Sequence, residues 1–236
     1  MKGCNSMKTI GLLGGMSWES TATYYRLINQ GVRERCGGLH SAKILLYSVD
    51  FAEIERLQSQ GRWQEAGVLL GEAARRLETA GAELLLICTN TMHKVADQIQ
   101  SCLDIELLHI ADATGRAIVA DGLESVGLLG TRFTMEEHFY RCILEERYGL
   151  QVSIPEPEER AAVDSIIFHE LCVGNIRDAS RRVYRQVIQN LASQGCQAII
   201  LGCTEIPLLL SGDDAGLPLY DTTAIHAEQA VVEMLG

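Results

Sequence analysis

The fold of this chain is decided by a stretch that occurs twice, GAELLLICTNT at residues 81–91 and GCQAIILGCTE at residues 195–205. In each copy, a turn led by glycine precedes a short apolar run that ends abruptly at small polar residues. Such a run is typical of a buried strand in a parallel sheet. Because open α/β sheets bind ligands at the carboxyl ends of their strands, the two copies predict one site shared by two similar halves.

The repeat extends beyond these strands. IGLLGGM at residues 10–16 returns as VGLLGTR at residues 126–132, and HIADA at 109–113 is echoed more weakly by LYDTT at 219–223. By subtraction, Gly127 follows Gly11 by 116 residues, and Cys203 follows Thr89 by 114. Parallel strands share apolar runs in general, but they do not in general share glycines at a nearly constant offset. The pattern therefore indicates a duplication.

Strand and helix patterns alternate along the whole chain, which predicts an α/β protein with parallel sheets. We expect two pseudo-symmetric α/β lobes. The first comprises residues 7–108 and 221–236, the second comprises residues 109–220, and residues 1–6 form an N-terminal extension. The last helix crosses back to the first lobe in this scheme.

Composition excludes several classes of function. The apolar fraction of 47% and charged fraction of 22% are those of a soluble globular protein. The net charge of −11 argues against nucleic acid as the partner, because binding nucleic acid requires a basic face. No apolar run reaches the length of a membrane span. The cysteines form no C-x-x-C pair, which argues against a zinc or redox site of that type.

The loop after the first predicted strand is rich in glycine but matches neither dinucleotide nor P-loop spacing. Its backbone around Gly15 and Met16 can approach a carboxylate at a helix start, and a simple tight turn explains it equally well. Hydroxyl and amide side chains follow other predicted strands and can bind a carboxylate: Asn90, Thr91, Thr131 and Thr134. Cys203 precedes a predicted helix, a place where the pKa of a thiol is lowered.

The chain resembles the cofactor-independent aspartate/glutamate racemases. The segments GLLGGM (11–16), NT (90–91) and GCTE (202–205) carry this resemblance, which covers nearly the whole chain after Met7. It implies two lobes with the active site between them, an amino-acid substrate, and neither pyridoxal phosphate nor metal. It also implies a homodimer. Because residues 1–6 do not look like a secretion signal, we expect free thiols and a cytoplasmic location. Thr204, within the last motif, is a further expected substrate contact.

In the family, two cysteines on opposite sides of the substrate α-carbon exchange its proton. Here the second position is Cys203, whereas the first is Thr89. Cys88 lies one residue early, and neighbouring strand side chains face opposite ways, so we expect it to pack against the sheet. A hydroxyl is a far weaker acid than a thiol. We therefore predict that Cys203 abstracts the proton and that Thr89 assists reprotonation. In the family the second cysteine serves the L enantiomer, so the resemblance implies that the L amino acid is the favoured substrate.

The residues that hold the substrate side chain also depart from the family pattern. A lysine of the aspartate racemases corresponds to Cys172, and an arginine corresponds to Arg56 or is replaced by Gln58. Arg132 stays a further candidate. Strict aspartate specificity is therefore not implied, and glutamate or several amino acids remain possible substrates.

Two other readings stay open. Maleate isomerases, hydantoin racemases and arylmalonate decarboxylases share the lobes and cysteines in the wider superfamily. A two-lobed amino-acid-binding protein that has lost one catalytic residue would also explain Thr89. Cys203 and Glu205 argue against this binder, because a pure binding protein needs no activated thiol.

Overall fold

The computed structural model describes residues 6–210 and 215–236. The N-terminal extension expected at residues 1–6 therefore falls outside the described residues, except for Ser6. The chain divides into two compact units, Met1–Ile110 with His226–Gly236 and Ala111–Ile225. No helix in the described part of the chain combines the length and apolar character needed to cross a bilayer.

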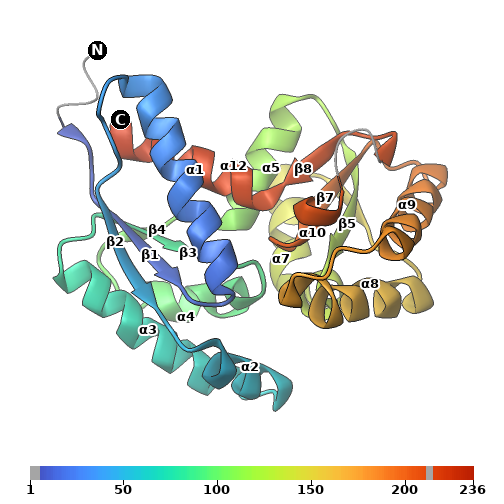
Figure 1. The fold of residues 1–236 in the computed structure, drawn as a ribbon, viewed down its shortest axis with the longest axis horizontal. Helices are drawn as coiled ribbons and strands as arrows, with labels where there is room; N and C mark the ends of the chain where they lie inside the picture. Colours follow the sequence, from blue (N-terminus) through green and yellow to red (C-terminus); the bar gives the residue numbers. More distant parts are fainter. Residues whose placement is uncertain (1–5, 211–214) are drawn as a thin grey trace. The chain divides into compact units, whose positions relative to one another are not determined.

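The first unit contains a parallel sheet in the order β2-β1-β3-β4 (Figure 1). Its elements are β1 (Ile10–Gly14), α1 (Trp18–Cys36), β2 (Ile44–Ser48), α2 (Phe51–Ser59), α3 (Trp63–Thr79), β3 (Leu84–Ile87), η2 (Thr91–Val95), α4 (Ala96–Gln100) and β4 (Glu106–Leu107), joined by most of α12 (Thr222–Leu235).

The second unit contains a parallel sheet in the order β6-β5-β7-β8. Its elements are most of α5 (Ile110–Ala120), then β5 (Ser125–Gly130), α6 (Arg132–Glu136), α7 (His138–Cys142), η3 (Ile143–Arg147), β6 (Gln151–Ser153), α8 (Pro157–His169), η4 (Leu171–Val173), α9 (Asp178–Ser193), β7 (Ala198–Gly202), α10 (Ile206–Leu209) and β8 (Leu219–Asp221). The two sheets have the same strand order, which confirms the predicted α/β class and the predicted similarity of the halves.

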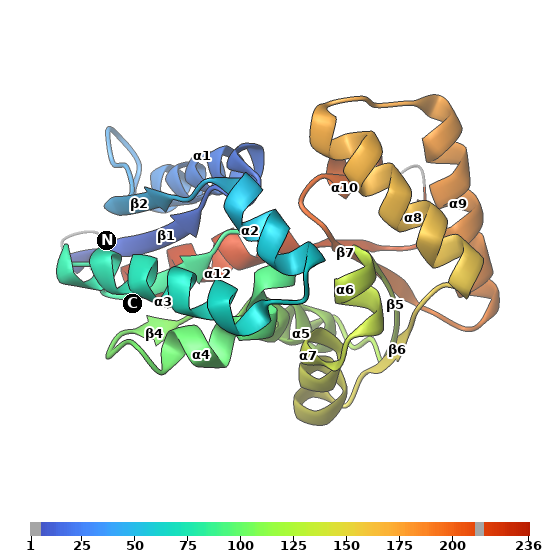
Figure 2. The same ribbon diagram turned by 90° about the horizontal axis from the view of Figure 1, so that it is seen from below.

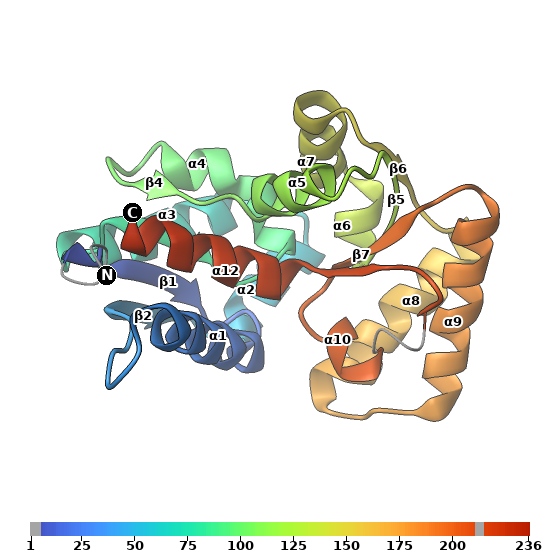
Figure 3. The same cartoon turned by 90° about the horizontal axis from the view of Figure 1, so that it is seen from above.

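Helices cover both faces of the first sheet. Leu12 of β1 packs with α1 and α12, whereas Leu13 packs with α2 and α3 on the other face. Figure 2 shows α3 and α4 on one side of β1, and Figure 3 shows α1 and α12 on the opposite side. Since alternate residues of a strand face opposite ways, both faces are apolar and the strand reads as a continuous hydrophobic run.

One predicted match between the halves is shifted. Leu107 of β4 pairs with Leu85, and Leu219 of β8 pairs with Ile199, so Leu107 corresponds to Leu219. The sequence comparison matched Leu219 with His109 instead. The error arises because β4 ends at Leu107 and α5 already begins at Ile110, so little strand pattern remains to fix the alignment.

The segment from residue 132 to residue 147 is not one continuous helix. The segment instead forms three short pieces, α6, α7 and η3. Thr131 caps α6 by accepting the Thr134 N–H, so the helix begins at Arg132. Glu137 then adopts an extended conformation with ψ of 154°, which separates α6 from α7.

Candidate functional site

Thr89 and Cys203 occupy the same register position in the two sheets. Gly11 of β1 pairs with Leu85 of β3, and Gly127 of β5 pairs with Ile199 of β7. Thr89 and Cys203 each lie four residues beyond these pairs. They are therefore equivalent by strand pairing as well as by sequence, and each follows the carboxyl end of the strand that carries it.

Backbone hydrogen bonds hold Thr89 in a tight turn after β3. Its N–H donates to the Ile87 carbonyl at 2.9 Å, and its own carbonyl lies 2.8 Å from Nδ1 of His93. Its neighbours Cys88 and Asn90 are buried, whereas Thr89 is half-buried. Thr89 is thus the most accessible residue at this strand end.

Cys88 does not replace the missing thiol. Its side chain is fully buried in the core cluster that contains Leu12 and Tyr24, as predicted from the alternation of strand side chains. Its carbonyl accepts a hydrogen bond from the Ser20 hydroxyl at 3.0 Å. Burial raises the pKa of the Cys88 thiol, so this group stays protonated and inert.

Gly15 is required by the shape of the first loop. Its φ is +91°, and an added Cβ would lie 2.3 Å from the Val49 carbonyl oxygen. Its N–H donates to Thr21 Oγ1 at 2.9 Å, so this donor is already used within the loop. The Met16 side chain belongs to the core that includes Leu13, which leaves its backbone as the part that can meet a ligand. Thr21 was missed because no local pattern links it to the glycines.

The polar residues expected beside Thr89 are mostly buried. Gln58 is 7% exposed, and its amide donates to Sδ of Met92 at 2.7 Å. Asn90 is buried and its carbonyl accepts the His93 N–H, while Thr91 begins η2. Arg56 lies instead on the exposed side of α2. Of the two candidates on that helix, Gln58 is therefore the one on the face that turns inward.

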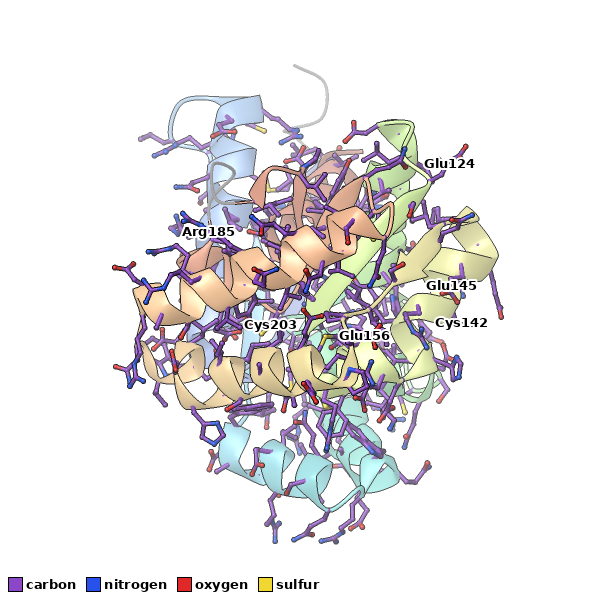
Figure 4. All side chains as sticks on the ribbon, turned by 90° about the vertical axis from the view of Figure 1, so that its right-hand side faces the viewer. Glu124, Cys142, Glu145, Glu156, Arg185 and Cys203 are labelled. Carbon is purple, nitrogen blue, oxygen red and sulfur yellow. The ribbon has the colours of Figure 1, made fainter. Side chains whose placement is uncertain are left out.

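Cys203 forms a thiol–carboxylate pair with Glu205. Its Sγ donates to Oε2 of Glu205 at 3.1 Å, and the Thr204 hydroxyl donates to the same oxygen at 2.6 Å. Cys203 is 8% exposed and Glu205 is 7% exposed. Figure 4 shows Cys203 among the ribbons of α8 and α9, in keeping with its place in the core cluster that contains Tyr184.

The expectation of a lowered thiol pKa at Cys203 is wrong. Burial and the Glu205 carboxylate raise the pKa of Cys203 well above its ordinary value. The helix that follows, α10, is one turn long and starts only at Ile206, so it offers little positive potential at the sulfur. Before reaction, Cys203 is therefore a protonated thiol, and the Glu205 carboxylate beside it can accept its proton.

Thr131 and Thr134 lie together after β5. Their hydroxyl oxygens are 3.2 Å apart, and Thr131 Oγ1 also accepts the Thr134 N–H as the cap of α6. Both residues are buried. Arg132 is exposed, and its backbone N–H donates to Asp164 at 2.7 Å, a partner that the sequence did not indicate. The two threonines form a local cluster, whereas the Arg132 side chain is not part of it.

Two further residues of interest lie in the second unit. Thr204 is half-buried beside Glu205. Cys172, at the position of the family lysine, packs against the core cluster that contains Cys203, and its charged form would raise the pKa of that thiol. Among the described residues, no group of three or more side chains is arranged to hold a metal ion.

Comparison with known proteins identifies the family of the chain. The model of the Asp/Glu/hydantoin racemase family matches residues 13–230. A broad-specificity amino-acid racemase of Bacillus subtilis is 24% identical over 94% of this chain and 96% of its own length.

Two solved structures extend the likeness to the fold. The crystal structure of a putative Asp/Glu racemase from Yersinia pestis is 56% identical with a TM-score of 0.93, over 98% of this chain and 100% of that one. An aspartate racemase homologue from Pyrococcus horikoshii is 35% identical with a TM-score of 0.84, over 97% and 99% of the two chains. The repeated strand ends, the matching sheets and these comparisons together place the chain in the Asp/Glu/hydantoin racemase family.

Proposed function

We propose that this protein is an amino-acid racemase that acts on acidic amino acids, aspartate or glutamate, without a cofactor. The observation that carries the proposal is the equivalence of Thr89 and Cys203 at the ends of β3 and β7, with the Cys203 thiol bonded to Glu205. The names of the relatives, which include aspartate, glutamate and broad-specificity racemases, support this substrate class.

In the proposed reaction, Cys203 removes the α-proton of the L enantiomer. Its thiol first passes a proton to the Glu205 carboxylate, which is 3.1 Å away, and the resulting thiolate accepts the α-proton and becomes a thiol again. The proton held by Glu205 leaves to solvent. The Thr89 hydroxyl then delivers a proton to the opposite face of the carbanion and regains one from water. The charge and proton count balance over the cycle.

The proposed preference for the L enantiomer has a definite kinetic meaning. Enantiomers have equal free energies in an achiral solvent, so kcat/KM must be the same in both directions. The asymmetry instead appears in how the carbanion partitions between its two faces. A good acid at Cys203 and a poor one at Thr89 return most carbanions to the L form. Exchange of the α-proton from L substrate should therefore be faster than inversion.

The remaining polar residues are proposed to bind the substrate. Side-chain hydrogen-bond donors lie near the two strand ends, on Asn90, Thr91, Thr131, Thr134 and Thr204. The backbone of Gly15 and Met16 adds peptide groups. Gln58 is the proposed partner of the side-chain carboxylate, because it is on the inward face of α2 and its amide is a hydrogen-bond donor. A homodimer and a cytoplasmic location complete the proposal.

A chiral assay of L- and D-aspartate and L- and D-glutamate with purified protein, without added cofactor, tests this function. We expect both enantiomers of at least one amino acid to appear from either starting form. Cys203→Ala should abolish conversion without preventing substrate binding by calorimetry. Binding without conversion in the parent protein would overturn the proposal.

Binding of the amino acid without conversion would favour the alternative function, a two-lobed amino-acid-binding protein. One observation speaks for it, namely that burial and Glu205 keep the Cys203 thiol protonated at rest. In this case Cys203→Ala and Thr89→Ala would leave the affinity for the amino acid nearly unchanged, because neither side chain would have a role beyond packing.

A further inference from the structure

His93 makes two hydrogen bonds that connect it to the Thr89 peptide and to the start of α5. It lies in η2, is 2% exposed, and its Nδ1 is 2.8 Å from the Thr89 carbonyl oxygen. On the other side of the ring, the Ile110 N–H donates to Nε2 at 3.3 Å. One imidazole therefore bridges two loops that follow neighbouring strands, β3 and β4.

These contacts select one tautomer. The Ile110 N–H can only donate, so Nε2 must be the unprotonated nitrogen, and the ring proton is on Nδ1. Nδ1 is then the donor to the Thr89 carbonyl. Burial and the neighbouring His109 lower the pKa of His93 well below its usual value, which keeps the ring in this neutral form.

The bond from His93 completes the restraint of the Thr89 backbone. The Thr89 N–H is held by Ile87, and its carbonyl is held by His93. A β-branched side chain has few χ1 choices once its backbone is fixed, so these two bonds limit the directions that the Thr89 hydroxyl can take.

No imidazole stands at the corresponding position of the second unit. With the offset of 114 between Thr89 and Cys203, the position that corresponds to His93 is Pro207. The Cys203 carbonyl instead accepts the Ile206 N–H at 3.2 Å within the backbone. The imidazole is thus present only on the side where a hydroxyl replaces the thiol.

We propose that His93 is a positioning residue for Thr89, and that it fixes the direction from which the hydroxyl delivers its proton. This inference rests on the proposed function, because it assigns a purpose to the Thr89 side of the reaction. His93 itself touches neither the substrate nor the transferred proton. Its loss should affect inversion and leave the chemistry at Cys203 in place.

Two variants separate the two bonds of His93. In His93→Asn, the amide nitrogen is as many bonds from Cα as Nδ1 is, so it can still donate to Thr89. In His93→Gln, the amide reaches the place of Nε2 and can accept from Ile110 but not serve Thr89. Tyr24→Phe is the matched control, because it removes a buried hydroxyl bonded to His226 in the same unit. Thermal unfolding of each variant shows whether it is folded.

The readout is proton exchange in D2O, followed by NMR for loss of the α-proton and by chiral chromatography for inversion, starting from the pure L substrate. We expect His93→Gln to slow inversion by about tenfold to a hundredfold, as expected for a misplaced reacting group, and to change exchange by less than about twofold. His93→Asn should recover most of the inversion rate. In a Thr89→Ala background, His93→Gln should have no further effect.

Three results would overturn the inference. Equal losses in the Asn and Gln variants, a parallel fall of exchange and inversion, or an undiminished effect of His93→Gln in the Thr89→Ala background would each assign His93 a purely structural role. These results leave the proposed function standing. Absence of both exchange and inversion in the parent protein would refute the proposed function and this inference with it.

Discussion

Thr89 and Cys203 stand at the same register position in two sheets of identical strand order, yet they carry different chemistry. Cys203 has a carboxylate partner within its own turn, whereas Thr89 is restrained through its backbone by an imidazole. The two halves thus agree in backbone and differ in the groups that hold or accept a proton. The predictions below follow from this difference.

Thr89→Cys should make the two sides alike. A second thiol at the equivalent position supplies a better acid and base than a hydroxyl. We expect the ratio of inversion to exchange, measured from the L substrate in D2O, to rise about tenfold or more, within the range attributed to acid–base catalysis. Thr89→Val, which keeps the shape and removes the hydroxyl, should lower the same ratio. An unchanged ratio in both variants would exclude Thr89 from proton delivery.

Glu205→Gln should separate the acidity of Cys203 from its activity. The Glu205 carboxylate raises the pKa of the thiol, so its loss lowers that pKa and shifts the pH profile of iodoacetamide labelling towards lower pH. Turnover should nevertheless fall by about 10²–10⁴-fold because the proton acceptor is gone. Mass spectrometry of the labelled peptide, with Cys203→Ser as the blank, follows the reaction. Full activity in Glu205→Gln would exclude the carboxylate as acceptor.

We expect the protein to lose stability in mild acid because His226 is buried in its neutral form. Burial lowers the pKa of His226 from 6.5 to about 3, with Tyr24 and Leu108 as its hydrogen-bond partners. Between these values the unfolded chain binds the additional proton, so the free energy of unfolding decreases as pH falls. From pH 7.5 to 5.5 this group alone contributes a decrease of about 1.4 kcal/mol. Urea unfolding at both pH values measures it.

His226→Gln should be less stable at pH 7.5 and should lose less stability on acidification than the parent protein. His40→Gln is the matched control, because it makes the same replacement at an exposed histidine. The pKa of the buried His93 is lowered too, so His93 also makes the free energy of unfolding decrease as pH falls. His226→Gln therefore retains part of the pH dependence of the parent protein. The account of His226 fails if both variants show the pH dependence of the parent.

Gly15→Ala should destabilise the first unit through both strain and collision. The residue has φ of +91°, and the new Cβ would meet the Val49 backbone. We expect a loss of about 1–3 kcal/mol in the free energy of unfolding. Gly37→Ala is the matched control, because Gly37 has φ of +71° and no atom within 4 Å of the added Cβ. Its smaller loss, about 1 kcal/mol, measures the strain alone. Equal losses in Gly15→Ala and Gly37→Ala would show that the loop at Gly15 moves to accommodate the added Cβ.

Much of the α/β fold could be predicted, because its buried strands appear in the sequence as apolar runs that end at small polar residues. The ends of β3 and β7 are local signals of this kind. The short strand β4 was misplaced because two residues carry almost no periodicity. Thr131 was expected to bind substrate, and its role as the cap that starts α6 was not foreseen.

The chemistry of the site was less predictable, because a pKa depends on neighbours that only the fold brings together. A helix start after Cys203 suggested a thiolate, but α10 is a single turn, and burial with Glu205 reverses the direction of the shift. The bond between His93 and the Thr89 carbonyl depends on the turn after β3, which has no sequence signature. The same holds for Thr21 and Asp164, which accept hydrogen bonds from the backbone N–H groups of Gly15 and Arg132. Only the fold brings these groups together.

The central claim is that one thiol and one hydroxyl share the proton transfer unequally. Its most direct test is solvent deuterium exchange by the parent protein with each pure enantiomer of the substrate, followed to a few per cent conversion. From the L form, exchange should exceed inversion, whereas from the D form nearly every exchanged molecule should appear as L. Fast exchange with retention from the D form, and none from the L form, would contradict the account.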